Sequence, residues 1–458
     1  MDAIDFFCAH VVERAARDFP DTAVDAAKTF ILDTLGVGIL GSNGPQAAEI
    51  AAVQDLSGQG HDARVWSTGK RLPAPAAALC NAYQTHNSEF DCVHEAAVAH
   101  VMTAVLPVAL AGAERIGGVS GARLIEAVVL GVDVAASLGV AASSGLRFFR
   151  PGTVGAFGGV AALGKLMGFD AERLRHAFSI VYGQVGGTMQ AHTEGSMLLA
   201  LQMGFNARNA VVACDLAAAG IEGPRNILEG PFGYFRLIEA GGDPARVAQD
   251  LGRLWRIAEV AHKPYPSGRA THGVVDACLE LRQRHAIAPD TIDQVVARVP
   301  PLIVHLVGRP PQENMAINYA RLCARYVAAR VLIGGAVRIE DFTDAAYRDA
   351  PTQDLTARIA LEVRDVGNPN ALTPVEVEVV MADGGRYSSR IATVLGNPGK
   401  PLSREAHLAK FRGNAQAAHR PMGHASTERL IELADGLEQV ADVTVLVDLA
   451  SGAALQQR

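Results

Sequence analysis

The sequence predicts a mainly α-helical chain with a second, smaller α+β domain, and three observations support this. Helical patterns follow one another from residue 1 to about 262. Alternating strand patterns begin after residue 264, and a helical pattern returns after residue 400. We therefore expect a large all-helical domain formed from both chain ends, 1–264 and 401–458, and an inserted α+β domain, 265–400.

The composition of the chain sets broad limits on its class. It has 458 residues, of which 49% are hydrophobic and 19% charged, so it is globular and long enough for more than one domain. The net charge is −7 and no dense Lys/Arg run is present, so we expect no nucleic-acid partner. The six cysteines are scattered without a CxxC pair, and the N-terminal stretch lacks the pattern of a secretory signal. These features predict a cytoplasmic protein with reduced thiols.

The predicted helices of the first 262 residues are strongly apolar. The segment 21–40 has apolar residues at helical spacing after Asp21, a candidate N-cap, and 120–143 is apolar on nearly every face. Interruptions such as Pro107 and Asp133 favour buried core helices over membrane spans, so we expect no membrane partner.

The α+β character rests on three strand patterns and one helical pattern. The segments 291–300 and 356–366 are rich in β-branched residues, and 374–394 alternates valine with glutamate before an Asp-Gly-Gly turn. The segment 318–335 is helical in pattern. After 400, the stretches 403–411 and 426–440 are again helical and are expected to pack with the first domain.

A cluster of ionisable residues stands directly before the apolar run that starts at residue 101. It contains Glu89, Asp91, His94, Glu95 and His100. Titratable groups that meet a buried helix have the shifted pKa values that proton transfer requires. A metal site using His86, Asp91, His94 and His100 is the weaker interpretation, because His94 and His100 are six residues apart rather than four, and we predict no metal. The alternative is a polar loop that caps the helix.

Three further segments carry candidate binding residues. Arg150 precedes Pro151 and a glycine-rich helix, which is typical of an anion site, although a surface arginine in a turn is the alternative. The proline-stiffened segment 262–273 presents polar residues at a domain boundary, where clefts form, and a solvated linker is the alternative. The stretch 187–210 holds Gln190, His192, Glu194 and Gln202 in an apolar frame, where loop and capping roles are the simpler interpretation.

Several blocks in this order resemble the MmgE/PrpD family over nearly the whole chain: 31–42, 87–114, 150–170, 227–235, 263–277 and 396–411. The resemblance implies a helical domain with an inserted α+β domain, a homodimer, no cofactor and small carboxylic acids as substrates. It implies catalytic roles for Asp91, His100, Lys263, His272 and Tyr326. Substrate-binding roles are expected for Glu89, His94, Arg150, Gln190, Gln202, Ser267, Gly268 and Arg269.

The chain departs from the family pattern at three places. Cys92 and Val93 stand where many members have other polar residues, and Arg150 stands where a histidine is common. Residues 199–202, Leu-Ala-Leu-Gln, stand where a Lys-x-Leu-His sequence is common. These losses of basic groups predict a substrate other than 2-methylcitrate, smaller or less charged.

The function expected from these observations is that of a cofactor-independent lyase. It would abstract the proton next to a carboxylate of a small carboxylic or polycarboxylic acid and eliminate water, with His100 or Lys263 as the base. Two alternatives stay open. One is an epimerase or racemase of a dicarboxylate, and the other is a catalytically inactive protein that binds small acids.

Overall fold

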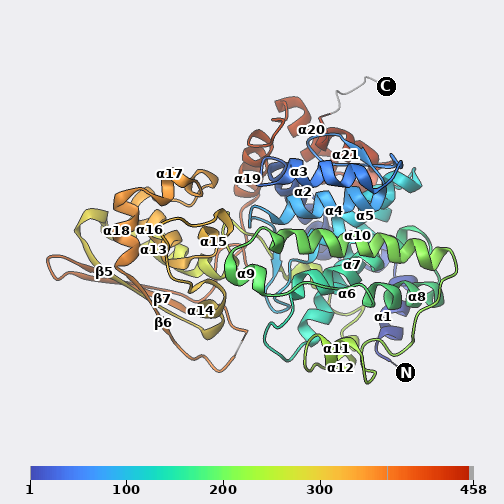
Figure 1. The fold of residues 1–458 in the computed structure, drawn as a ribbon, viewed down its shortest axis with the longest axis horizontal. Helices are drawn as coiled ribbons and strands as arrows, with labels where there is room; N and C mark the ends of the chain where they lie inside the picture. Colours follow the sequence, from blue (N-terminus) through green and yellow to red (C-terminus); the bar gives the residue numbers. More distant parts are fainter. Residues whose placement is uncertain (1, 369, 453–458) are drawn as a thin grey trace.

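A computed structural model describes residues 2–368 and 370–452 (Figure 1). It confirms the predicted fold class: a large helical part lies beside a smaller α+β part. The helical part begins with twelve helices, which are α1 Ile4–Glu13, α2 Asp21–Gly41, α3 Ala47–Gln54, α4 Ala74–His86, α5 Val101–Ile116, α6 Gly121–Ala141, α7 Arg150–Leu166, α8 Ala171–Tyr182, α9 Gln190–Glu194, α10 Leu198–Ala218, α11 Tyr234–Leu237 and α12 Pro244–Ala248. Two short strand pairs accompany them, β1 Ala63–Arg64 with β2 Arg71–Leu72, and β3 Val93–His94 with β4 Val260–Ala261.

The ends of these helices follow local chemistry. Ser120 caps α6 by accepting a hydrogen bond from the backbone N–H of Arg123, as a serine at this position commonly does. Asp21, in contrast, is not the N-cap of α2. Pro20 occupies that position. Asp21 lies in the first turn, where its negative charge interacts favourably with the positive end of the helix dipole.

The core of the helical part is formed by α5, α6, α7 and α10. Small residues allow the backbones of these helices to approach closely. A Cβ added to Gly158 of α7 would lie 2.7 Å from the carbonyl oxygen of Gly131 of α6, too close for any residue larger than glycine. Helix α6 is long and apolar enough to cross a membrane, but 89% of its most apolar window is buried in the protein, as expected for a core helix. Its packing between neighbours accounts for its composition.

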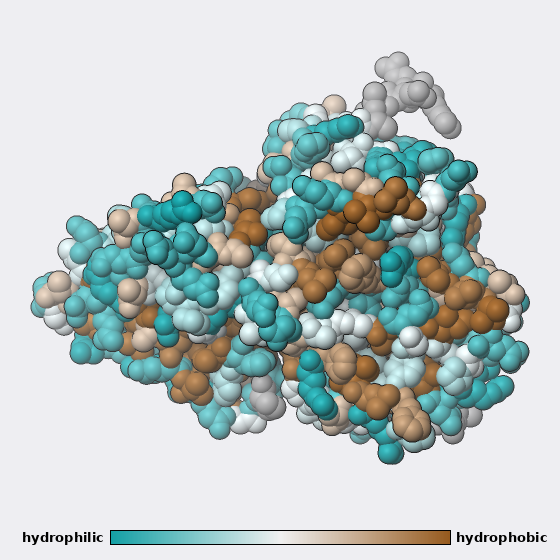
Figure 2. Space-filling model, in the orientation of Figure 1, coloured by the Kyte–Doolittle hydropathy of each residue, from teal (hydrophilic) through white to brown (hydrophobic). Residues whose placement is uncertain are grey.

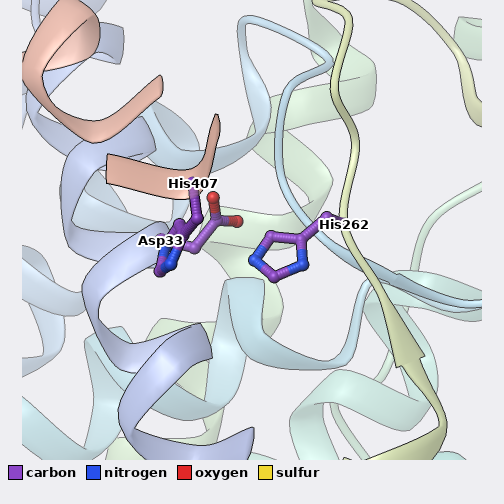
Figure 3. Close-up of side chains that lie close together, drawn as sticks. All are labelled: Asp33, His262 and His407. Carbon is purple, nitrogen blue, oxygen red and sulfur yellow. The ribbon is translucent and has the colours of Figure 1, made fainter. Parts of the chain in front are cut away.

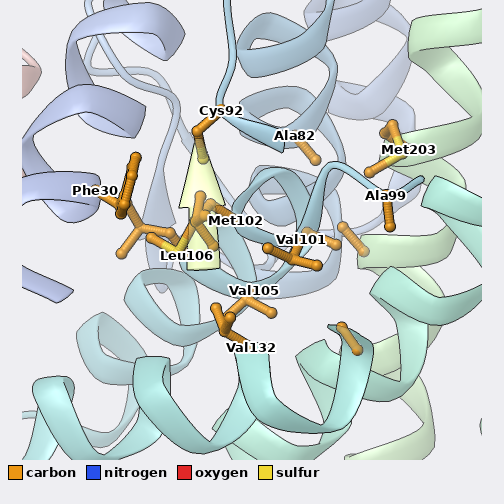
Figure 4. Close-up of a cluster of buried hydrophobic side chains, with 14 of the residues drawn as sticks. Phe30, Ala82, Cys92, Ala99, Val101, Met102, Val105, Leu106, Val132 and Met203 are labelled. Carbon is orange, nitrogen blue, oxygen red and sulfur yellow. The ribbon is translucent and has the colours of Figure 1, made fainter. Parts of the chain in front are cut away.

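The segment that carries the predicted site is anchored in this core. Figure 4 shows Cys92, next to Asp91, within the cluster of Phe30, Met102 and Leu106. Burial raises the pKa of the Cys92 thiol well above its ordinary value, so this cysteine packs as an apolar side chain.

The C-terminal helices return to the helical part. They are α19 Arg404–Gln416, α20 His424–Asp435 and α21 Thr444–Ala450. Helices α19 and α20 pack on α2, and the Lys410 ammonium lies 2.7 Å from the Asp33 carboxylate. Both chain ends therefore form the helical part, while the limits at residues 264 and 400 stay predictions.

The α+β part contains a four-stranded sheet in the order β6–β5–β7–β8. Its elements are α13 His272–His285, β5 Ile292–Val299, α14 Pro301–Val307, α15 Ile317–Arg321, α16 Ala324–Gly334, α17 Asp344–Tyr347, α18 Ala350–Ala357, β6 Ile359–Val363, β7 Val375–Met381 and β8 Arg386–Ile391. Strands β5 and β6 are parallel, and β7 and β8 form the predicted hairpin, with Gly384 at a φ of 89° in its turn. Val375, Val377 and Val379 are buried on the face of β7 that α13 covers.

Short 3-10 turns connect these elements at Ala16–Asp18, Asp55–Ser57, Arg256–Glu259, Arg269–Thr271, Pro289–Thr291, Ile339–Asp341 and Leu437–Gln439. In the view of Figure 2, hydrophilic residues dominate the surface of the α+β part, while hydrophobic residues gather over the helical part. Leu56, after α3, and Leu198 of α10 are exposed there among the large apolar side chains of the described chain.

Candidate active site

A strand pairing joins two of the predicted site segments. Val93 pairs with Ala261 and His94 with Val260 in the short antiparallel ladder of β3 and β4. This pairing places the acidic loop 87–92 against the segment that starts at His262. Glu89 and Val98 have φ values of 52° and 49°, a conformation that is costly for residues other than glycine and that occurs often at functional sites.

Asp91 is the centre of the resulting cluster. Its Oδ2 accepts hydrogen bonds from Thr103 Oγ1 at 2.6 Å and from His86 Nδ1 at 2.9 Å, and lies 3.0 Å from His100 Nδ1. Its Oδ1 lies 3.5 Å from Lys263 Nζ. The predicted residues Asp91, His100 and Lys263 are thus brought together. The Nδ1 atoms of both imidazole rings lie within 3.0 Å of Asp91, and that of His86 is hydrogen-bonded to it.

Lys263 bridges the two carboxylates of the loop. Its Nζ donates to Glu89 Oε2 at 2.9 Å and to the Glu89 backbone oxygen at 3.2 Å. The Lys263 side chain is 0% exposed, so this ion pair is stable only because each charge has partners. The lysine, which comes from the boundary segment, therefore fixes that segment to the acidic loop.

The pKa values of the cluster diverge. Burial alone would raise the pKa of both carboxyl groups, but the neighbouring cations outweigh it: the pKa of Glu89 falls to about 2, and that of Asp91 falls well below its ordinary value. Burial lowers the pKa of His100. Burial acts on His86 in the same way, but Asp91 and Glu89 outweigh it and raise the pKa of His86. His100 is thus suited to accept a proton, and the neighbouring His86, with its higher pKa, is suited to carry one. The site therefore contains a base next to an acid.

A cavity of about 80 Å³ opens at this cluster, well above the roughly 10–15 Å³ that one water needs. It lies at the junction of the two parts of the protein. Its polar lining residues are His86, Glu89, Glu95, His100, His192 and Arg269. The rest of the lining is Gly268 and apolar side chains: Val93, Val98, Leu146, Phe149, Pro151, Met189, Leu199, Ala270, Leu306, Val307, Leu322 and Leu372.

The boundary segment contributes structural contacts as well as lining. Arg269 Nε donates to Glu95 Oε1 at 2.7 Å, and one of its terminal nitrogens reaches the backbone oxygens of His262 and Leu395. His272 is buried behind Arg269: its Nε2 lies 3.2 Å from the Ser267 oxygen and its Nδ1 3.3 Å from an Arg269 nitrogen. Burial and Arg269 hold the pKa of His272 well below its ordinary value, so it is a neutral support of the segment.

The remaining predicted residues of this segment and loop have local partners. Ser267 Oγ lies 2.8 Å from Thr271 Oγ1, and Gly268 lines the cavity with a carbonyl that accepts from Thr271. A Cβ at Gly268 would lie 2.6 Å from Leu322, so a larger residue would displace that wall. His94 Nε2 lies 3.1 Å from Glu259, which directs its ring away from the cavity lining.

Arg150 does not have the free guanidinium that the sequence suggested. It is 1% exposed, and two of its nitrogens donate to the Glu239 carboxylate at 2.8 Å each, in a bidentate pair. A guanidinium neutralised in this way is a structural tie rather than an anion clamp. The glycine-rich helix still reaches the cavity through Pro151.

Tyr326, Gln190 and Gln202 also lie outside the cavity lining. The Tyr326 hydroxyl donates to the Asp341 backbone oxygen and borders a separate hollow in the α+β part. Gln190 is exposed and hydrogen-bonded to Glu194, and Gln202 accepts from the Thr188 N–H at 2.7 Å. Each of the three has a local hydrogen-bond partner, and their predicted roles in the site stay predictions.

Other residues reach the site without being predicted as members of it. His86 contacts Asp91 directly, His192 lines the cavity, and Arg309 contacts His192. His86 and His192 were visible in the sequence as polar points near the site segments. Arg309 gave no signal, because it stands in a proline-rich loop more than two hundred residues from the acidic cluster.

Among the residues that the structure describes, two groups of side chains have atoms close enough to hold a metal ion. One is His86, Asp91 and His100 in the site, and the other is Asp33, His262 and His407 (Figure 3). In the second, Lys410 lies 2.7 Å from Asp33, and burial lowers the pKa of His262 to about 3. In both groups a lysine ammonium contacts the carboxylate and provides the positive charge that a metal would otherwise bring.

Comparison with known proteins agrees with this architecture. The family model described as the MmgE/PrpD N-terminal domain matches residues 6–246, and the MmgE/PrpD C-terminal domain matches residues 265–438. The chain is 29% identical to the cis-aconitate decarboxylase of Homo sapiens over 450 residues, which cover 94% of this chain and 91% of that protein. It is 27% identical to the cis-aconitate decarboxylase-like protein oryM of Aspergillus oryzae, over 97% of this chain and 96% of that protein.

A cis-aconitate decarboxylase of Aspergillus terreus is 25% identical over 96% of this chain and 94% of its own length. The two family matches together account for most of the sequence; the second begins at residue 265 and runs to 438, so it also includes α19 and α20 of the helical part. The resemblance seen in the sequence motifs is thereby confirmed: this chain belongs to the MmgE/PrpD family.

Proposed function

We propose that this protein is a lyase that acts on a small carboxylic acid by proton transfer at the carbon next to a carboxylate, without a metal or organic cofactor. The observation that supports this most is that the pKa values of His86 and His100, which both lie against Asp91, are shifted in opposite directions. The names of the relatives, all cis-aconitate decarboxylases or like them, support a lyase over other enzyme classes.

His100 is the proposed base. Its Nδ1 lies 3.0 Å from Asp91, which orients the ring, and burial keeps the ring neutral at pH 7. Since it lines the cavity, it can take the α-proton of a bound acid. Protonated His86, with Lys263 behind Glu89, would stabilise the negative charge that develops on the substrate carboxylate.

The leaving group distinguishes the candidate reactions. In a dehydration, the C–H electrons form a double bond and the β-hydroxyl leaves with a proton from an acid. In a decarboxylation, the bond to the carboxylate breaks, CO2 leaves, and carbon receives a proton from the same acid. The sequence predicts water as the leaving group, whereas the names of the relatives favour CO2. Dehydration takes a proton from carbon and decarboxylation gives one to carbon, so the same site would move the proton in opposite directions in the two reactions.

Proton NMR in D2O tests this proposal with a panel of hydroxy acids and unsaturated di- and tricarboxylic acids. Deuterium at the carbon next to a carboxylate, together with an alkene or a decarboxylated product, supports the lyase. Exchange with only a change of configuration would mean the epimerase. Binding without any exchange would mean the inactive binding protein.

We also propose the homodimer that the family resemblance implies. The exposed apolar side chains around α3 and α10, including Leu56 and Leu198, support a contact surface on the helical part (Figure 2). Light scattering at micromolar concentration tests this: a mass of twice 48.1 kDa is expected, and a mass of 48.1 kDa would contradict it.

A further inference from the structure

We infer that Arg309 and His192 form a carboxylate-binding subsite of the cavity, and that the substrate carries no more than two carboxylates. The inference rests on the proposed function for the identity of the cavity as a substrate site. It goes further by naming the residue that recognises the acid and the charge that the site accepts.

Arg309 crosses the junction of the two parts of the protein. It follows α14 in the α+β part, and one of its terminal nitrogens lies 3.3 Å from Nδ1 of His192, a residue of α9 that lines the cavity. Its guanidinium stacks on the Tyr319 ring at 4.9 Å from the centroid. This stacking fixes the plane of the guanidinium next to the cavity wall.

Arg309 lacks the acidic partner that buried arginines usually have. Within residues 2–368 and 370–452 no carboxylate pairs with it, and its Nη1 is buried without a hydrogen-bond partner. Burial accordingly lowers its pKa, and that of His192 falls to about 4, so His192 is neutral and its Nε2 carries a proton. A carboxylate that enters the cavity beside His192 would meet a cation and a donor, neither of which is in an ion pair with a carboxylate of the described residues.

The charge of the cavity surroundings limits the substrate. The charged groups that line the cavity or contact its lining, other than histidines, are the cations Lys263, Arg269 and Arg309 and the anions Glu89, Asp91 and Glu95. Their charges balance, or leave one positive charge when His86 is protonated. Each further carboxylate of a substrate adds uncompensated negative charge to a buried site, which is costly, so a tricarboxylate is disfavoured against a dicarboxylate.

The apolar lining agrees with this limit. Leu146, Phe149 and Leu199 line the cavity with apolar side chains, and Leu199 stands where the family commonly has a lysine. Such a lining stabilises an alkyl or alkenyl substituent and not a third carboxylate. We therefore expect a monocarboxylate or dicarboxylate with an uncharged substituent.

Isothermal calorimetry with unreactive acids tests the inference separately from catalysis. Succinate, methylsuccinate and propane-1,2,3-tricarboxylate are titrated into the full chain at pH 7.5. Wild type is expected to bind the dicarboxylates at least about 10-fold more tightly than the tricarboxylate. Arg309→Gln is expected to weaken dicarboxylate binding by about 10- to 100-fold, the usual cost of a charged hydrogen bond.

Arg364→Gln is the matched control, since Arg364 pairs with Glu376 on the sheet of the α+β part, away from the cavity lining, and should bind like wild type. Tricarboxylate binding as tight as dicarboxylate binding would overturn the charge limit. Unchanged binding by folded Arg309→Gln would overturn the subsite, and so would the absence of dicarboxylate binding by wild type. If Arg309→Gln does not fold, His192→Leu replaces it; it should also weaken dicarboxylate binding, and unchanged binding there would overturn the subsite.

The D2O exchange experiment separates the two proposals. Dicarboxylate binding without deuterium exchange by any acid would contradict the lyase but keep the subsite. Exchange that is fastest with a tricarboxylate would keep the lyase and contradict the subsite.

Discussion

The Nδ1 atom of His100 lies 3.0 Å from the Oδ2 atom of Asp91, at the start of α5, which is buried from Val101 to Ala113. Asp91 is ionised because His86, His100 and Lys263 surround it, despite the burial that opposes its charge. The carboxylate thus lies beside a ring that lines the cavity, as the partner of a general base does.

Replacement of His100 by Asn is expected to lower kcat by at least about 10²-fold, the usual contribution of a general base. Asp91→Asn is expected to lower kcat as well, because the ring loses its orientation. The measurement is the rate of deuterium exchange. His94→Asn is the control: His94 pairs with Glu259 and lies outside the cavity lining, so its kcat should stay within a few-fold of wild type.

Loss of Lys263 is expected to destabilise the fold. Lys263→Met leaves the Glu89 and Asp91 carboxylates buried without their lysine, which should cost about 3–5 kcal/mol of unfolding free energy. Adding Glu89→Gln to this variant removes one of the two unpaired charges and should recover part of the loss. Denaturant unfolding of the two single variants and the double variant measures this coupling, and simple additivity would contradict the ion pair.

Arg150 is expected to be a stability residue. Arg150→Met leaves the Glu239 carboxylate buried without its bidentate partner, so the unfolding free energy should fall by about 3–5 kcal/mol. In Arg150→Lys, which keeps the charge, KM should change by less than about threefold, since the guanidinium does not line the cavity. A large rise in KM with unchanged stability would restore the anion clamp suggested by the sequence.

The stability of the protein is expected to fall on acidification below pH 6.5. The pKa of His192 is about 4 in the folded protein against 6.5 for the free side chain, because burial and Arg309 oppose its charge. The unfolded state then binds more protons between these values, so the contribution of His192 is complete above pH 6.5 and is lost progressively down to about pH 4. The loss is about 3 kcal/mol for this residue.

Urea unfolding between pH 4 and pH 7 measures this loss. In His192→Gln the unfolding free energy should depend less steeply on pH in that window. His61→Gln, at an exposed position, should follow the wild-type profile. Parallel profiles for all three proteins would contradict a neutral, buried His192.

The parts of the fold that repeat regularly were predictable from sequence. The apolar spacing of α2 and α6 and the valine alternation of β7 each report their own burial, because one face or every face of the element packs on its neighbours. The turn at Gly384 was predictable because its positive φ of 89° favours glycine, which the sequence shows directly.

The site could be predicted where the residues are clustered in sequence and not where they are distant. Asp91, His100 and Lys263 lie in short, unusual segments, and the structure brings them together. The role of an arginine is hard to predict because a nearby carboxylate decides whether its guanidinium is free: Arg150 is paired with Glu239, whereas Arg309, which the sequence did not single out, contacts His192. Glu239, 89 residues after Arg150, has no signal in sequence that marks it as a partner.

The central claim is proton abstraction by His100, and deuterium exchange in D2O tests it most directly. The proposal predicts that wild type incorporates deuterium next to a carboxylate of at least one acid of the panel. His100→Asn, folded as judged by thermal unfolding, should do so at least about 10²-fold more slowly. Equal exchange rates for the two proteins would contradict the assignment of the base.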